Sequence, residues 1–161
     1  MSAFLQGIPL DRVIFVPGSF NSVWIQDYGP WTVYQDKVGE RGISDYRYNR
    51  PARPLDDFVP YELADFIGLP LYNADENPYR WVHTGGNFLV DGMGTAYSSD
   101  LVLRENSGRT GREIEQWAQV FFGIDDYRML YRLPFDTIHH LDMHLRLMDE
   151  ETIAVGYYPE G

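Results

Sequence analysis

Two stretches of the chain space their apolar residues as one face of a helix does. In residues 110–122, apolar residues recur at positions i, i+3, i+4 and i+7. Thr110 and Glu113 form a capping-box pair at the start of this stretch, and Gly123 supplies a stop at its end. Residues 56–67 repeat the spacing more loosely. The pattern predicts a helix in each stretch.

The other apolar residues lie in short runs separated by turn residues, which is typical of strands and hairpins. The Asp-Gly-Met-Gly segment at residues 91–94 is a strong hairpin signal. Three pairs of strands are predicted: 31–34 with 43–48, 87–90 with 95–98, and 141–148 with 152–158. Together with the helices they indicate an α/β or α+β fold.

A weak internal repeat runs through these elements. Gly7, Gly68 and Gly123 are each followed by an apolar residue, at a spacing of roughly 55–60 residues. Each glycine is typical of a helix end that leads into a strand, so the repeat favours stacked supersecondary units. The alternative is that a glycine and an apolar residue follow many helices by chance.

A polar residue follows each of these glycines at nearly the same distance, about 20 residues. The three residues are Asp27, Asn87 and Asp142. In a ring of equivalent units, matching positions converge near the axis. We therefore expect the three side chains to line one central pocket.

The first of these residues, Asp27, lies between Trp24 and Trp31 and just before a Tyr-Gly-Pro turn. A carboxylate among aromatic walls can bind a cation through charge and through cation–π contact. The alternative is a structural role, in which the carboxylate accepts backbone N–H groups of an Asx-turn.

The second motif is His83-Thr-Gly-Gly-Asn87. Two successive glycines allow the backbone to turn sharply or to approach a ligand closely, and Asn87 would then present its amide to the pocket. The alternative is an ordinary loop that enters a hairpin.

The third motif, residues 139–148, alternates polar and apolar residues and is interpreted as a strand. One face then carries a histidine beside a carboxylate, a pair that can act in general acid and base catalysis. The residues of this face are His140, Asp142, His144 and Arg146, and those of the apolar face are Leu141, Met143, Leu145 and Leu147.

A metal site and an ordinary surface pair of histidines are the alternatives for this motif. His139, His140, Asp142 and His144 carry nitrogen and oxygen atoms that suit a metal ion. A strand, however, separates His140 and His144 by about 13 Å, which is too far for them to share one ion.

The composition excludes several classes of protein. With 13 Lys and Arg against 24 Asp and Glu, the formal net charge is −11, which repels phosphate backbones and argues against nucleic-acid binding. No apolar run approaches the ~18 residues of a membrane span. There is no cysteine, and hence no disulfide, no Cys-type zinc site and no thiol nucleophile in these residues. The acidic balance favours cationic ligands, although many proteins are acidic for solubility alone.

Taken in order, the three motifs resemble those of a known family. The matching segments are Trp24-Ile-Gln-Asp-Tyr-Gly-Pro-Trp31, Thr84-Gly-Gly-Asn-Phe-Leu-Val-Asp-Gly92 and His140-Leu-Asp142. Together with Tyr48-Asn-Arg-Pro51, they resemble the bacterial-type peptidylarginine deiminase and agmatine deiminase family. This family is a branch of the guanidine-modifying superfamily, which has the pentein fold.

The resemblance implies an α/β propeller of five ββαβ repeats, of which residues 1–161 would form about three. Both ends of the sequence look cut, so we expect a partial pentein domain. An open propeller leaves strand and helix faces uncovered, so we also expect aggregation or self-association into a homo-oligomer. The resemblance further implies a cytoplasmic protein with no cofactor and no metal.

The resemblance also assigns roles to the motif residues. Asp27 and Asp142 would grip the substrate guanidinium, and His140 would act as the general acid and base. In the family a Cys thiolate attacks the guanidinium carbon, ammonia leaves, and water then releases a ureido product. Because this chain has no cysteine, we expect no turnover from these residues alone. The residues expected around the substrate are Trp24, Gly86 and Asn87.

The guanidine substrate stays open between an arginine peptide, which would give citrulline, and agmatine, which would give N-carbamoylputrescine. Gln26 and Thr84 stand where agmatine deiminases commonly carry Arg and Glu, which favours the peptidylarginine branch. Arg50 and Arg53 form a candidate fork for a substrate carboxylate, a group that agmatine lacks. A solvated Pro-Arg loop is the alternative to that fork.

Two other classes of function remain as alternatives to an enzyme. One is a degenerate pentein that binds guanidines or a protein partner without catalysis, which the missing cysteine would explain. The other is a structural domain with no site.

Overall fold

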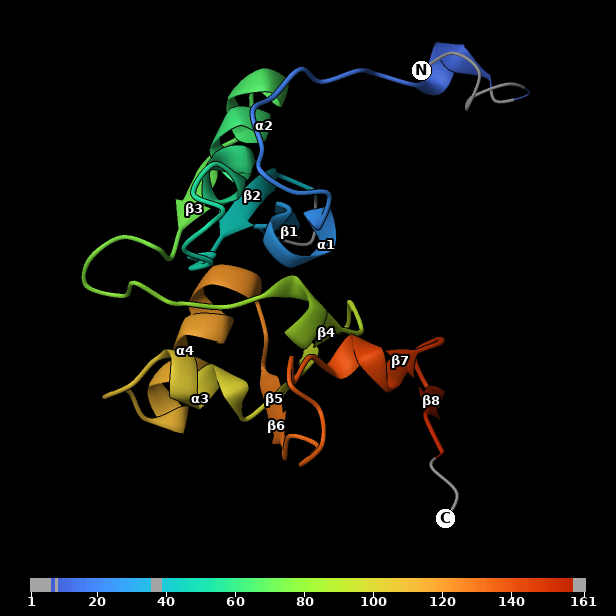
Figure 1. Ribbon diagram of the computed structural model, residues 1–161. Helices are drawn as coiled ribbons and strands as arrows, with labels where there is room; N and C mark the ends of the chain where they lie inside the picture. Colours follow the sequence, from blue (N-terminus) through green and yellow to red (C-terminus); the bar gives the residue numbers. More distant parts are fainter. Residues whose placement is uncertain (1–6, 8, 36–38, 158–161) are drawn as a thin grey trace.

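The first sheet of the protein belongs to a ββαβ unit (Figure 1). The computed structural model describes residues 7, 9–35 and 39–157. Strand β1 (Trp31–Tyr34) pairs antiparallel with β2 (Arg41–Asp45), and β2 pairs parallel with β3 (Leu71–Asn73). The crossover from β2 to β3 contains α2 (Val59–Ile67). A helical turn, α1 (Ile25–Tyr28), precedes β1.

The second sheet repeats this topology. Strand β4 (Leu89–Val90) pairs antiparallel with β5 (Thr95–Ser99), which pairs parallel with β6 (Asp126–Leu130). Two helices, α3 (Leu101–Glu105) and α4 (Gly111–Phe122), form the crossover from β5 to β6. The connection is the one that parallel strands require, because a tight turn cannot join them.

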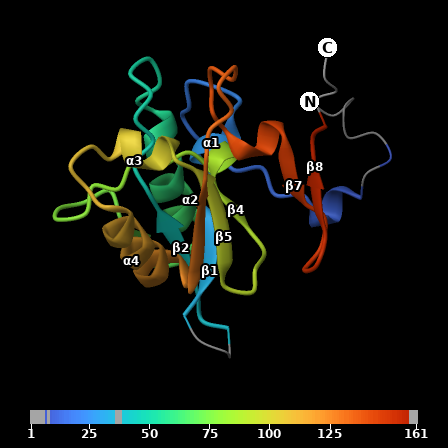
Figure 2. The same ribbon diagram turned by 90° about the horizontal axis from the view of Figure 1, so that it is seen from below.

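The third sheet is a hairpin of β7 (Leu145–Leu147) and β8 (Ile153–Val155), and β7 lies against β4 (Figure 2). The described residues thus form two complete ββαβ units and the opening hairpin of another. The α/β class and the ββαβ repeat are as predicted. The unit expected to start at Gly7 differs, because the described residues 9–24 contain only a 3-10 turn, Leu10–Arg12, and no strand.

The predicted helix ends are confirmed for two of the three glycines. Gly68 and Gly123 follow α2 and α4 with φ angles of 68° and 66°, a left-handed conformation in which a glycine meets no Cβ penalty. Any helix before Gly7 would fall on residues outside the described ones. No described helix is long and apolar enough to cross a membrane.

The predicted strands are shorter in the structure, because helical turns take up the residues before β4 and β7. Gly85–Asn87 forms a 3-10 turn before β4, and Leu141–Met143 forms one before β7. The interpretation of residues 141–148 as one strand is therefore wrong. Its apolar face is also incomplete, since Leu141 is fully buried whereas Met143 is 56% exposed.

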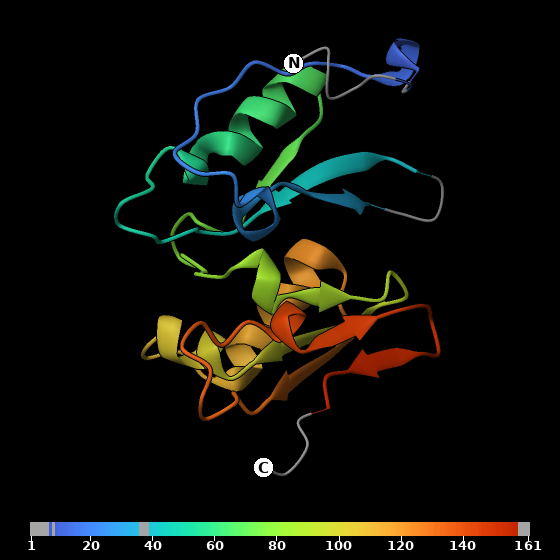
Figure 3. The same ribbon diagram turned by 45° about the vertical axis from the view of Figure 1, so that its right-hand side comes forward.

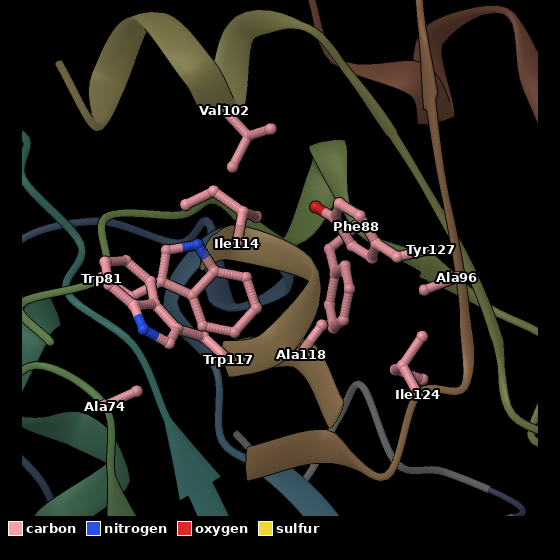
Figure 4. Close-up of a cluster of buried hydrophobic side chains, with 10 residues drawn as sticks. All are labelled: Ala74, Trp81, Phe88, Ala96, Val102, Ile114, Trp117, Ala118, Ile124 and Tyr127. Carbon is pink, nitrogen blue, oxygen red and sulfur yellow. The ribbon is translucent and has the colours of Figure 1, made fainter. Parts of the chain in front are cut away.

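The main hydrophobic core lies in the second unit and is rich in aromatic side chains (Figure 4). Helix α4 buries three residues of its predicted apolar face, Ile114, Trp117 and Ala118, and the fourth, Phe121, is partly buried against the same cluster. They pack with Trp81 and Phe88 in one cluster of buried residues. A hydrogen bond from Ser44 Oγ in β2 to the Phe121 carbonyl ties the first unit to this helix.

The start of α4 gives a first testable prediction. Thr110 Oγ1 accepts a hydrogen bond from the Glu113 amide, and the Glu113 carboxylate accepts one from the Thr110 amide, which completes the capping box. We expect Thr110→Ala to lower the free energy of unfolding by about 1 kcal/mol. Urea denaturation measures this loss, and Gln116→Ala on the exposed face of α4 is the control. Equal stability of the two variants would contradict the prediction.

Candidate functional site

A short helical turn precedes each of the three hairpins, and these turns lie against one another. They are α1 before β1, Gly85–Asn87 before β4 and Leu141–Met143 before β7. The Gly85–Asn87 turn contacts both of the others, and Figure 3 shows the three turns close together at the centre of the molecule, in blue, green and orange. The repeat thus brings the three sequence motifs to one place, as predicted.

The exact point of convergence is Gly86. A Cβ atom built on this residue would lie 2.6 Å from His140 Nδ1, 3.0 Å from Asp142 Oδ2 and 3.0 Å from Asp27 Oδ1. The Gly86 amide also donates a hydrogen bond of 3.2 Å to Asp27 Oδ1. Two carboxylates and an imidazole therefore surround the space above one glycine.

The neighbouring glycine explains why the turns can come so close. A Cβ atom on Gly85 would lie 1.8 Å from the Gln26 carbonyl oxygen, so only glycine lets the Gly85–Asn87 turn pack on α1 backbone to backbone. The turn therefore needs glycine at both positions. Gly85 allows the packing on α1, and Gly86 leaves room for the three side chains of the site.

His140 is the buried member of the group. Its residue is 7% exposed, and its Nδ1 lies 3.6 Å from Asp27 Oδ1. Its Nε2 is buried and has no hydrogen-bond partner among the described residues. Nδ1 thus faces a carboxylate, while Nε2 forms no hydrogen bond with the described residues.

Asp142 lies at the more open side of the group, in the turn that follows His140. Burial raises the pKa of Asp142 above its ordinary value of 3.8, and repulsion from Asp27 adds to this, while His140 opposes it. The strand interpretation placed His140 and Asp142 on one face, and the structure brings them together through a 3-10 turn instead. Arg146, predicted for the same face, lines a separate cavity of about 380 Å³ that Asp142 also borders.

A larger cavity, of about 820 Å³, contains most of the predicted site residues. Six of them line it: Trp24, Asp27, Arg50, Arg53, His140 and Asp142. Several other residues line the cavity without having been predicted from the sequence, among them Gln26, Tyr48 and Met143. Tyr48 could have been predicted, because it is the first residue of the Tyr-Asn-Arg-Pro segment that resembles the family. Met143 was instead assigned to the apolar face of the predicted strand.

Asn87 does not line this cavity, which differs from the expectation. The residue is fully buried, its Oδ1 accepts a hydrogen bond of 2.8 Å from the Ser99 amide, and its Nδ2 lies 3.5 Å from the Ser99 carbonyl oxygen. The side chain therefore joins the Gly85–Asn87 turn to the end of β5. The turn presents its glycine to the site and turns its asparagine into the protein.

The two arginines of the predicted fork have different environments. Arg50 forms an ion pair of 2.8 Å with Glu105 and donates a hydrogen bond to Thr84 Oγ1, so its charge is already compensated. Arg53 donates to the hydroxyl of Tyr48 at 3.1 Å, and no carboxylate pairs with it in the part of the chain that the structure describes. Arg53 is therefore the cation that can accept an anionic group in the cavity.

A metal ion has no evident place in the described part of the protein, where no group of three or more His, Asp and Glu side chains is arranged to hold one. The polar groups that line the cavity are carboxylates, an imidazole and guanidinium groups, and the aromatic residues Trp24 and Tyr48 line it as well. This set suits an organic cation with a planar, hydrogen-bonding head.

Comparison with known proteins agrees with this chemistry. A family model described as Porphyromonas-type peptidyl-arginine deiminase matches residues 2–160. The chain belongs to this family. Among curated relatives, a Vibrio parahaemolyticus protein provisionally named agmatine deiminase is 29% identical over 126 residues, which cover 71% of this chain and 33% of the relative. A Lactococcus lactis protein of the same provisional name is 32% identical over 102 residues, which cover 60% and 27%.

Solved structures of peptidyl-arginine and agmatine deiminases share the fold. Agmatine deiminase of Enterococcus faecalis superposes with a TM-score of 0.75 at 24% identity, over 88% of this chain and 41% of that chain. A Porphyromonas gingivalis protein provisionally named arginine deiminase superposes with a TM-score of 0.75 at 23% identity, over 94% and 48%. The pentein-type fold predicted from the motifs is thus confirmed, and the chain spans less than half of either of these structures.

Proposed function

We propose that this chain carries the guanidinium-binding and proton-transfer groups of a guanidine deiminase. The observation that carries the proposal is the convergence of Asp27, His140 and Asp142 on Gly86. A guanidinium is planar and cationic and offers parallel N–H donors, so two carboxylates facing one small space match both its charge and its hydrogen bonds. The rings of Trp24 and Tyr48 in the same cavity add contact area for the rest of the substrate.

His140 has the geometry for moving protons at this place. Its Nδ1 faces the space above Gly86, where it can protonate the amino group that leaves as ammonia and can then accept a proton from the water that replaces it, while the carboxylate of Asp27 beside it stabilises the charged ring. The reaction also needs a nucleophile at the guanidinium carbon. The 161 residues contain no cysteine, so a thiolate would have to come from outside them, and we expect no ammonia release by this chain alone.

For the substrate, we favour an arginine derivative with a free carboxylate over agmatine. The support is Arg53, which lies in the cavity without a carboxylate partner in the described structure. Agmatine is the second candidate, because the Vibrio and Lactococcus relatives carry the name agmatine deiminase.

The substitution Arg53→Ala tests this preference. We expect it to weaken the binding of Nα-acetyl-arginine about tenfold and the binding of agmatine far less, as measured by isothermal titration calorimetry. An equal loss for both ligands would favour agmatine.

Titration of the protein with agmatine and with Nα-acetyl-arginine tests the binding function itself. We expect Asp142→Asn to weaken both by at least about tenfold, because the variant removes one of the two charges that face the guanidinium. Asp149→Asn is a matched control, since Asp149 is an exposed carboxylate in the β7–β8 hairpin. Equal affinities of the two variants would refute the site.

The raised pKa of Asp142 adds a pH dependence to this test. Only the ionised carboxylate pairs with a guanidinium, so we expect affinity to fall as the pH decreases through that raised pKa, which lies above the ordinary 3.8. The Asp142→Asn variant should lose this part of the pH dependence. A profile that Asp142→Asn leaves unchanged would mean that another group controls binding.

A further inference from the structure

We propose that Ser99 is a positioning residue that fixes His140 relative to Gly86. Ser99 is the last residue of β5 and is fully buried. It contacts both of the segments that carry the site, and it touches neither the cavity nor the substrate position. Its effect on guanidinium binding rests on the proposed function, whereas its effect on His140 does not.

The first link joins Ser99 to the turn that presents Gly86. The Ser99 amide donates to Asn87 Oδ1 at 2.8 Å, and Asn87 directly follows Gly86 in the chain. Both partners are fully buried, so water does not compete for this hydrogen bond. The turn is therefore held at a fixed distance from the end of β5.

The second link joins Ser99 to the segment that carries His140. Ser99 Oγ donates a hydrogen bond of 2.7 Å to the carbonyl oxygen of His139. That carbonyl belongs to the peptide unit between His139 and His140, which is planar. Fixing its oxygen fixes the orientation in which the chain enters His140.

The backbone of His139 explains why such a link is needed. His139 has a φ of 64°, a left-handed conformation that is strained for a residue with a side chain. On the N-terminal side of His139, the carboxylate of Asp136 accepts hydrogen bonds from the amides of Ile138 and His139. Ser99 and Asp136 thus hold the carbonyl and the amide of His139, and the strained conformation of this residue turns His140 toward Gly86.

The variant Ser99→Ala removes the second link, together with a longer hydrogen bond of 3.4 Å that Ser99 Oγ accepts from the Leu101 amide. It deletes the hydroxyl but keeps the backbone amide that bonds to Asn87. In NMR spectra of the ligand-free protein, we expect Ser99→Ala to shift the imidazole signals of His140. In the titration with Nα-acetyl-arginine or agmatine, we expect about a tenfold loss of affinity.

Ser98→Ala is a closely matched control. Ser98 is the neighbouring residue of the same strand and is also fully buried, but its Oγ accepts a hydrogen bond from the Tyr127 hydroxyl and has no link to His139. Each variant loses one short hydrogen bond, and Ser99→Ala loses in addition the longer one from the Leu101 amide, so thermal unfolding should show losses of stability of similar size. Only Ser99→Ala should move the His140 signals and weaken binding.

The outcomes separate this proposal from the proposed function. If Ser99→Ala leaves the His140 signals as in the parent, or if Ser98→Ala moves them equally, the positioning role is refuted. If the signals move as expected but the parent itself binds neither guanidine, the proposed function fails and the positioning role stands. Should Ser99→Ala not fold, Asp136→Ala acts on the same residue, His139, through its amide, and must move the same His140 signals for the proposal to survive.

Discussion

Replacing Gly86 with alanine is expected to abolish guanidinium binding while leaving the protein folded. The new methyl group would lie 2.6 Å from His140 Nδ1 and 3.0 Å from a carboxylate oxygen of each of Asp27 and Asp142. These atoms are the ends of side chains, so they can move away, but they would then leave the arrangement that faces the substrate. We expect affinity for agmatine or Nα-acetyl-arginine to fall by about 100-fold, which corresponds to about 2.7 kcal/mol.

Circular dichroism checks that the Gly86→Ala variant is folded, and calorimetric titration measures its loss of affinity. Gly111→Ala is a suitable control, because a Cβ at Gly111 would make only an ordinary contact of 3.6 Å with Met129 Cε, and this variant should bind as the parent does. Gly86 has no left-handed φ that would itself penalise alanine. Retained affinity in a folded Gly86→Ala protein would show that the three side chains do not bind the ligand at this point.

The helices and their ends were the most predictable part of the fold. Helix α4 carries a full set of local signals, with a capping box at Thr110, an apolar stripe and a left-handed glycine at Gly123. Each of these signals comes from contacts within one turn of the helix, so the sequence alone contains them. The capping glycine of α2, Gly68, was found for the same reason.

The short turns before the strands were not predictable in the same way. A 3-10 turn such as Leu141–Met143 spans only three residues, which is too few to show a period of its own. The alternation of polar and apolar residues around it therefore suggested one long strand. Packing against the turn Gly85–Asn87 decides the conformation, and that partner lies far away in the sequence.

The site could be predicted in part from the sequence, because charged side chains at matching positions of a repeat indicate a polar pocket. A glycine indicates such a pocket only weakly. The structure brings Asp27, His140 and Asp142 together as the repeat and the motifs suggested. The three side chains meet at Gly86, which was among the residues expected around the substrate, whereas Asn87, the residue expected to line the pocket with Asp27 and Asp142, faces away from it. An amide side chain suggests a ligand contact, but whether it faces a cavity or the end of β5 depends on tertiary packing that no local pattern records.

A buried carboxylate in the first unit leads to a different prediction, on stability. Asp45, at the end of β2, is 4% exposed, and its Oδ2 has no hydrogen-bond partner among the described residues. Burial, together with repulsion from Asp57 and Asp75, raises the pKa of Asp45 from 3.8 to about 8. The folded protein therefore holds a proton on Asp45 that the unfolded chain releases near pH 4.

The sign of the effect follows from proton binding. Between the unfolded pKa near 3.9 and the folded pKa of about 8, the folded state binds more protons, so the stability contributed by Asp45 is complete below this window and declines as the pH rises through it. Asp45→Asn resembles the protonated acid and does not ionise.

We therefore expect Asp45→Asn to unfold several degrees above the parent at pH 8.5, with a smaller difference at pH 5.5. Thermal denaturation at the two pH values measures this, and Asp65→Asn on the exposed side of α2 should show no such change with pH. A gain of the same size at both pH values would mean that packing, rather than ionisation, causes it. A loss at pH 8.5 would mean that the folded protein keeps Asp45 charged and stabilised, contrary to its burial among other carboxylates.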